Sequence, residues 1–308
     1  MTMITASMVK QLRDKTGAGM MDCKAALNET QGSMEPAIDW LRKKGLSKAA
    51  KKSGRIAAEG LVALVHHGDR GVLVEVNSET DFVAKNESFQ TLVRRIAQIA
   101  LEKGDEIEAL KGASYPGGGT VAEAIANSIA TIGENITLRR AKLLRVTNGI
   151  IGTYIHTPMG DGVGKIGVLV AIESPGKHPE LAGFGRKIAM HVAATNPLAL
   201  DSTSLDKETV ARERAILAEK HQGKPANVID KIVESGLKTF YKEVCLVEQP
   251  YVHEQSKSVT VGQAVQEFAN QIKQPVRIAA FVRFALGEGI EKGTGGDFAG
   301  EVAAMAKG

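Results

Sequence analysis

The chain has 308 residues, of which 43% are hydrophobic and only 4% aromatic, so it can form two or three structural units with a mostly aliphatic core. Its longest apolar runs are far shorter than the roughly 20 residues of a membrane-spanning helix. Its first residues lack the basic flank and long apolar stretch of a secretory signal. Cys23 and Cys245 are isolated, without metal-ligand spacing, and this favours buried free thiols in a cytoplasmic protein over a disulfide or metal site.

The formal net charge of +4 is unevenly distributed along the chain. Residues 1–55 contain 11 Lys and Arg against 5 Asp and Glu, whereas the remainder is slightly acidic. Such a basic segment can bind nucleic acid, but it can equally be a solvated helix or contact an acidic protein surface. No aromatic residues interleave with the lysines that close this segment, so the sequence does not support stacking on single-stranded bases.

Residues 5–44 have the periodicity of three short helices, with a break at 17–19 and Ser33 as the cap of the third helix. A bundle of about forty residues is marginally stable alone, so we expect it to dock on something larger. Met20 and Met21 lie on the second helix, where each can be a core residue or an adaptable contact, and we expect a core position for one of the two.

After Gly54 the pattern changes to strands. Two apolar runs around Gly68-Asp69 predict a β-hairpin over 62–77, and a helix over 89–102 follows. Next come a glycine-rich loop over 112–119, a helix from Thr120 to Ile132 and a strand over 134–146. The glycine cluster lacks the Lys-Ser/Thr pair of a phosphate-binding loop.

The same pattern then repeats. Strands over 151–156 and 166–174 and a helix over 184–193 echo the first set, which indicates an internal duplication of a hairpin-helix-strand unit. Each copy is expected to be an antiparallel sheet covered by helices, so the predicted fold class is α+β. The run 160–165 resembles a phosphate loop, but Met159 and Ile166 occupy the glycine and Ser/Thr positions, so we interpret it as a hairpin turn.

An insertion over 205–243 interrupts the second copy. Apolar residues at spacings of three and four, on either side of a Gly-Lys-Pro turn, predict a projecting antiparallel helical hairpin that the core does not require. Its ends, near Leu205 and Val244, should lie close together. The remaining expected elements are a strand over 244–252, a helix over 261–272, a strand over 277–284 and an amphipathic helix over 297–307.

The junction between the strand ending at Val76 and the next helix has mixed chemistry. Thr80 and Asp81 are natural cap or turn residues. Phe82 is a large apolar side chain that a polar loop does not need. It can fold back under the following helix as a hydrophobic staple, or it can be exposed for a partner.

Two longer runs, Leu12–Leu27 and Glu75–Lys85, resemble the two signatures of the elongation factor Ts family, in the same order. The resemblance extends over nearly the whole chain, from Ile4 to about Ala306. It implies the following division: a three-helix ubiquitin-associated-like domain (1–54), two core subdomains (55–146 and 147–290), the coiled-coil insertion (205–243) and a C-terminal helical module (291–308).

By this resemblance the protein is a guanine nucleotide exchange factor for the GTPase elongation factor Tu, not an enzyme, and has no cofactor of its own. Thr80, Asp81, Phe82 and Val83 would press into the GTPase domain beside its Mg²⁺ and promote GDP release. The implied assembly is a heterodimer or a larger complex with the partner, without direct nucleic-acid or membrane binding. Further candidate partner contacts are Lys10, Arg13, Met20, Lys24 and His191. A lone histidine on an apolar helix, such as His191, is ordinarily a hydrogen-bonded core residue.

Two other functions stay open at this point. The basic N-terminal unit is compatible with an RNA- or ribosome-associated protein, and the glycine-rich loops with a small enzyme. The chain contains no His-Glu-x-x-His motif, paired-cysteine cluster or nucleophile elbow. Salt-insensitive binding to a GTPase would separate the exchange factor from the RNA-binding protein, and failure to bind free nucleotide would argue against the enzyme.

Overall fold

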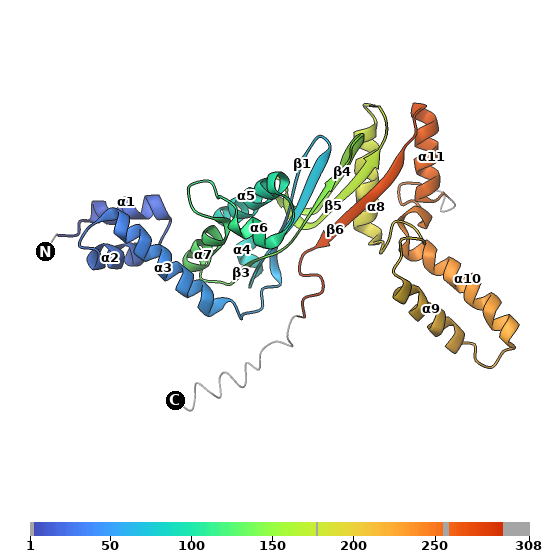
Figure 1. Ribbon diagram of the computed structural model, residues 1–308, viewed down its shortest axis with the longest axis horizontal. Helices are drawn as coiled ribbons and strands as arrows, with labels where there is room; N and C mark the ends of the chain where they lie inside the picture. The colour runs from blue at the N-terminus through green and yellow to red at the C-terminus, as the bar shows by residue number, and fades with distance from the viewer. Residues whose placement is uncertain (1–2, 177, 255–258, 292–308) are drawn as a thin grey trace.

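The computed structural model describes residues 3–176, 178–254 and 259–291. A helical unit at the N-terminus, a central sheet covered by helices, and a projecting helical hairpin follow one another along an elongated molecule (Figure 1). The mixture of helices with an antiparallel sheet agrees with the predicted α+β class. Within the described residues, no helix is long and apolar enough to cross a membrane.

The N-terminal unit contains the three predicted helices, but the third is longer than expected. Its buried residues include Leu12, Cys23 and Leu27. The last helix continues beyond residue 44 because its second half packs on the core, where Gly45 lies against the side chains of Asn127 and Ala130. The helices are α1 (Ala6–Thr16), α2 (Met20–Glu29) and α3 (Met34–Lys52).

The first half of the sheet has the predicted hairpin, with Gly68 and Asp69 as its two-residue turn. The middle strand of this half pairs with a neighbour on each side, and both pairings are antiparallel. Helices cover one face, where Phe89 and Ile96 pack with Val74 and Val76. The elements are β1 (Glu59–His67), β2 (Arg70–Ser78), α4 (Asp81–Ala84), α5 (Glu87–Lys103), α6 (Ile107–Gly112), α7 (Val121–Ile132) and β3 (Ile136–Arg145). The short helix α6 was not predicted.

The second half repeats this strand arrangement. Its middle strand also has an antiparallel neighbour on each side, and the run 160–165 contains a hairpin turn, as predicted. The pairs Val62–Gly164 and Ala63–Val163 join the two halves into one six-stranded sheet. The elements are β4 (Gly149–Gly160), β5 (Val163–Glu173), α8 (Leu181–Thr195), α11 (Val261–Ile272) and β6 (Arg277–Ala285).

The repeat extends further than the sequence pattern indicated. Both α7 and α11 have 12 residues, and each begins with a capping box. In α7 the box is Thr120 with Glu123, and in α11 it is Thr260 with Gln263. Each capped helix precedes the last strand of its half, so the two halves share hairpin, long helix, capped helix and strand.

The insertion forms the predicted antiparallel pair of helices and projects from the molecule (Figure 1). Its ends lie close together, since the Leu198 N–H donates to the Val244 carbonyl at 2.8 Å and Leu205 packs in one small cluster with Cys245. The helices are α9 (Lys207–Glu219) and α10 (Ala226–Val244).

The strand predicted over 244–252 is wrong. The chain makes a short 3₁₀ turn, η1 (Leu246–Glu248), in which the Gln249 N–H donates back to the Cys245 carbonyl at 3.0 Å. Pro250 has no N–H to donate to a strand ladder. Only isolated bridges, such as Ala199–Cys245, form within this described segment.

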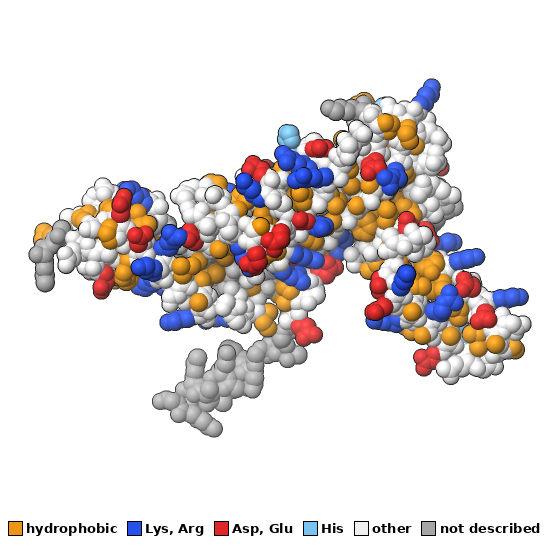
Figure 2. Space-filling view, viewed as in Figure 1, with side chains coloured by type: hydrophobic (Ala, Val, Ile, Leu, Met, Phe, Trp, Pro, Cys, Tyr) orange, Lys and Arg blue, Asp and Glu red, His pale blue; other side chains and the backbone are white. Residues whose placement is uncertain are grey.

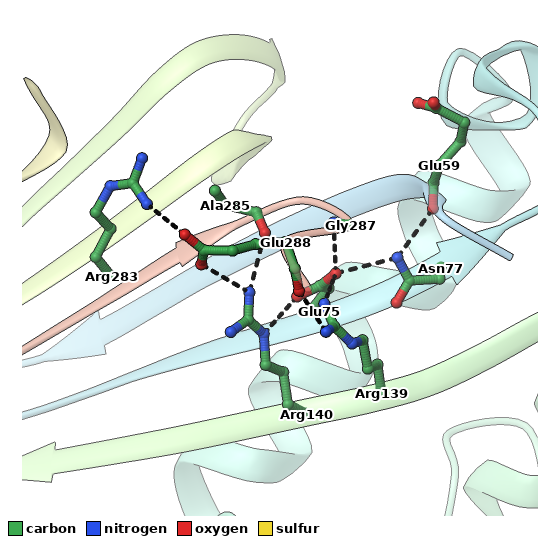
Figure 3. Close-up of polar contacts among 9 residues, drawn as sticks. All are labelled: Glu59, Glu75, Asn77, Arg139, Arg140, Arg283, Ala285, Gly287 and Glu288. Atoms are coloured by element: carbon green, nitrogen blue, oxygen red, sulfur yellow. Dashed lines mark hydrogen bonds and ion pairs between the residues drawn. The ribbon is translucent and has the colours of Figure 1, made fainter. Parts of the chain in front are cut away.

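Val74 and Val76 on β2 pack with α5, so the side chain of Glu75 between them lies on the opposite face of the sheet. There it connects the two halves of the chain (Figure 3). It is completely buried, and one carboxylate oxygen accepts hydrogen bonds from the Gly287 N–H at 2.8 Å and from Arg139 and Asn77 at 3.0 Å each. The other oxygen is paired with Arg140 at 2.5 Å. Burial by itself raises the pKa of Glu75, but the hydrogen bonds from Gly287 and Arg140 outweigh it and hold the pKa below the ordinary 4.5.

The amphipathic helix predicted over 297–307 lies outside the described residues.

Candidate functional site

The predicted site is the short helix α4, between β2 and α5. Neighbouring side chains on a helix point about 100° apart, so a single turn can direct one side chain outward and the next inward. Phe82 is 74% exposed, whereas Val83 is 5% and Ala84 1% exposed and both pack in the core with Phe89. The hydrophobic staple is therefore wrong for Phe82, because Val83 packs in the core with Phe89 of α5 instead. The side chain of Val83, another of the predicted partner-binding residues, faces the core in this structure.

The start of the turn is held by the loop between α7 and β3. Thr80 occupies the N-cap position of α4, but its hydroxyl donates to Glu134 at 2.7 Å and its N–H donates to the same carboxylate at 2.9 Å. In return, the Asn135 N–H donates to the Glu79 carboxylate at 2.5 Å. We call these four residues (Glu79, Thr80, Glu134 and Asn135) the reciprocal clasp. The sequence pattern gave no signal for it, because its partners are more than 50 residues apart.

The end of the turn is held as well. Asn86 caps α5 by accepting from the N–H groups of Ser88 and Phe89. The Gln90 amide donates to the carbonyls of Ala84 and Met159, both at 3.0 Å, and so connects α4 to β4. The exposed Phe82 thus lies on a turn that is fixed at both ends. Asp81, the first residue of α4, is exposed beside it.

A cationic side chain lies near the Phe82 ring. The Lys85 ammonium lies 5.8 Å from the ring centroid, within the range of a cation–π interaction. Lys85 is itself exposed, so this contact is weak and leaves Phe82 accessible.

The other predicted contacts lie elsewhere. Lys10, Arg13 and Lys24 are exposed on α1 and α2 of the N-terminal unit. Met20 and Met21 are 58% and 76% exposed, so the expectation that one of them is a core residue is wrong. The core of this unit is filled instead by smaller residues and by leucines from all three helices.

Almost half of the cations in residues 1–55 are already paired within the chain. Lys44 and Lys48 both contact Asp22, whose pKa is lowered first of all by the hydrogen bond from Lys48. Acidic side chains lie among the basic ones on the face of this unit shown in Figure 2. Three further pairs join this segment to the core: Arg42 with Glu123, Lys52 with the Gly133 carbonyl, and Arg55 with Glu79.

His191 on α8 is completely buried. It is hydrogen-bonded in the core, as expected for a lone histidine on an apolar helix, and it is not exposed to a partner in this structure. Its Nε2–H donates to the Gln249 side chain at 2.9 Å, and its Nδ1 accepts from the Val252 N–H at 3.3 Å. Burial lowers the pKa of the ring, which agrees with a neutral imidazole between one donor and one acceptor.

Comparison with known proteins identifies the family. The family model "Elongation factor TS" matches residues 79–288. Elongation factor Ts of Methylocella silvestris is 64% identical over 309 residues, which cover 100% of this chain and 99% of the relative. Elongation factor Ts of Rhodopseudomonas palustris (strain BisA53) is 62% identical, with 99% of each chain covered, and that of Methylobacterium nodulans is 60% identical over the full length of both. The chain belongs to the elongation factor Ts family.

Membership of the elongation factor Ts family makes the chain a translation elongation factor of protein biosynthesis, with nucleotide exchange rather than covalent catalysis as its activity. The region matched by the family model begins at Glu79, in the reciprocal clasp, and ends at Glu288. It therefore includes α4, the helices α5 to α8 and α11 that pack on the sheet, and the inserted hairpin. The alignments with the relatives also include the N-terminal unit.

Proposed function

We propose that this protein binds elongation factor Tu and promotes GDP release by inserting Phe82 beside the Mg²⁺ site of the GTPase. The observation that supports this most strongly is that Phe82 is 74% exposed although the next two side chains of the same turn, Val83 and Ala84, are buried. Burying a phenylalanine is worth roughly 1.5–3 kcal/mol. A fold that leaves this ring in water forgoes that stabilisation, which a bound partner would recover.

The fixed turn suits this role. Because the reciprocal clasp and Gln90 hold α4 at both ends, little conformational entropy is lost when Phe82 enters a partner. Asp81 lies beside Phe82 and would disturb the polar groups around the ion. Mg²⁺ neutralises phosphate charge and helps to hold the nucleotide, and each ~1.4 kcal/mol lost weakens GDP about tenfold.

The cycle then follows from linkage. If the exchange factor weakens GDP binding, GDP weakens binding of the exchange factor by the same factor. An incoming nucleotide therefore displaces the exchange factor. The protein needs no reactive group or cofactor of its own for this mechanism.

The N-terminal unit supplies a second contact in this proposal. Lys10, Arg13 and Lys24 are exposed and would face an acidic helix of the GTPase, with Met20 as an adaptable apolar neighbour. The complex would be a cytoplasmic heterodimer or a larger assembly of such pairs. The alternative of an RNA- or ribosome-associated protein is less well supported, because five of the 11 cations in residues 1–55 contact groups of this chain.

The direct test is release of a fluorescent GDP from purified elongation factor Tu. Adding the full chain in substoichiometric amounts should accelerate release, and excess Mg²⁺ should oppose it. A release rate unchanged by the chain would contradict the proposal. Salt-sensitive binding to RNA, together with no effect on release, would favour the alternative instead.

A further inference from the structure

A single loop of the core, residues 133–135 between α7 and β3, contacts both the N-terminal unit and the reciprocal clasp that holds α4. Asn135 makes both contacts. Its backbone N–H donates to Glu79 of the clasp at 2.5 Å, and its side-chain amide donates to the carbonyl of Arg55 at 2.7 Å. Arg55 lies in the connector between α3 and β1, residues 53–58. The connector is thereby fastened to the clasp.

The hydrogen bond from the Asn135 side chain differs from the other links between this connector and the core. Asn135 is only 4% exposed, and a buried amide that loses its hydrogen-bond partner is costly. The ion pairs of Arg42 with Glu123 and of Arg55 with Glu79 each include an arginine whose side chain is more than half exposed. Exposed ion pairs contribute little to stability. We therefore expect the buried hydrogen bond to hold the connector more firmly than either ion pair.

The apolar contact between α3 and the core is made by small residues. Among the described residues, Ala49 is the only residue of α3 that packs with the large core cluster of the first half. Gly45 lies close to α7, but it has no side chain that could interlock with its neighbours. Because small residues offer few atoms for dispersion contacts, we expect this contact to fix the position of α3 but not its angle. The polar contacts at the end of α3 then decide that angle.

We propose that Asn135 is a positioning residue that sets the orientation of the N-terminal unit relative to Phe82. This inference rests on the proposed function, in which α1, α2 and Phe82 contact the same GTPase. When two contacts are joined rigidly at the right separation, formation of one raises the effective concentration of the other. If the connector is freed, each contact keeps its own chemistry but this advantage is lost. Asn135 therefore acts on the affinity for the partner and not on the step at which Phe82 promotes GDP release.

The first test separates affinity from maximal rate in the full chain. Asn135→Ala removes the side-chain amide but keeps the backbone N–H that donates to Glu79. In stimulated GDP release from elongation factor Tu, the concentration of this variant that gives half-maximal release should rise about tenfold, with a saturated rate within about twofold of wild type. An unchanged half-maximal concentration, or a saturated rate as low as that of Phe82→Ala, would overturn the proposal. Asn135→Asp keeps the size of the side chain but cannot donate, so it should give the same result and serves if the smaller variant does not fold.

The second test is a double-mutant cycle with the charge reversal Lys10→Glu and Lys24→Glu. This reversal should weaken the affinity for elongation factor Tu about tenfold in the native chain, but less than about twofold in the Asn135→Ala chain, because the freed N-terminal unit no longer binds in register. An equal loss of affinity in both chains would overturn the role of Asn135 alone. No loss in the native chain would contradict the proposed N-terminal contact, and the inference with it.

Gln249→Ala is the matched control for loss of a buried amide. Gln249 is 3% exposed and its side-chain amide donates to the Glu243 carbonyl at 2.7 Å, but it lies in the second half of the chain. In this background the charge reversal should still weaken the affinity about tenfold. If Gln249→Ala suppresses the effect of the charge reversal as well, general loss of stability explains the result and the proposal is wrong. A cooperative thermal transition shows that each variant is folded.

Discussion

Thr80 donates two hydrogen bonds to the carboxylate of Glu134, one from its N–H at 2.9 Å and one from its hydroxyl at 2.7 Å. This pair fixes the N-cap residue of α4, the turn that carries Phe82. Since Glu134 is half-buried and lies in the loop before β3, it positions Phe82 without being exposed with it.

Glu134→Ala should therefore impair exchange more than stability. Loss of positioning worth about 1 kcal/mol would slow stimulated GDP release roughly fivefold. Glu134→Gln keeps one acceptor for Thr80 and should fall between Ala and wild type. GDP release and thermal unfolding should be measured on the same three proteins. Unchanged release with a large fall in melting temperature would show that Glu134 serves only the fold.

The N-terminal cations are best tested by charge reversal in the full chain. Removal of residues 1–54 would also remove the half of α3 that packs on α7, so its effect on binding could not be separated from damage to the core. Lys10→Glu with Lys24→Glu should weaken the affinity for elongation factor Tu about tenfold at low salt and less at high salt. The matched double reversal Lys220→Glu with Lys224→Glu, at the tip of the hairpin, should not. Equal affinities for the two double variants would contradict a contact at α1 and α2.

The inserted hairpin should be dispensable for the core. α9 contains no buried residue, and the side chain of Leu217 on α9 packs against Gly236 on α10. Because Leu205 and Val244, on either side of the hairpin, pack in one cluster, a short glycine linker can replace residues 207–243. We expect a shift in melting temperature of no more than about 4 °C, equivalent to about 1 kcal/mol in a chain of this size. Loss of the cooperative transition would show that the hairpin is part of the core.

The buried Glu75 should make stability depend on acid pH. Its folded-state pKa is below the unfolded value of 4.5, so its contribution is fully present above pH 4.5 and is lost as the pH falls through the folded-state pKa. Glu75→Gln should cost about 1.5–3 kcal/mol at pH 7, and this deficit should shrink below pH 4.5. Urea unfolding at several pH values measures it, with the exposed Glu108→Gln as a control that should have no deficit. A Glu75→Gln deficit that is constant with pH would contradict the charged network.

The sequence predicted those features that depend on neighbouring residues. The Gly68-Asp69 turn and the Thr120 cap are short-range, so their hydrogen bonds are encoded locally. The exposure of Phe82 could be inferred only by weighing the staple against a partner contact, because both fit the same residues. The outward direction of its ring depends on Val83 and Phe89 filling the core first.

The remaining features depend on contacts between distant residues. The Thr80–Glu134 pair is separated by 54 positions and the Glu75–Gly287 pair by 212, and periodicity contains no information about either. The strand expected over 244–252 had suitable residues, but tertiary contacts around Gln249 and His191 favour a turn. Tertiary contact also lengthens α3, whose second half becomes stable against α7.

The most direct measurement of the central claim uses one protein, Phe82→Ala, and two observables. Because the ring is 74% exposed, its removal should leave the melting temperature within about 2 °C of wild type. Stimulated GDP release from elongation factor Tu should slow at least tenfold, as expected when roughly 1.5–3 kcal/mol of burial in the partner is lost. Leu198→Ala, a similarly exposed apolar position at 59%, should change neither. A clear fall in the melting temperature of Phe82→Ala with normal GDP release would contradict the account.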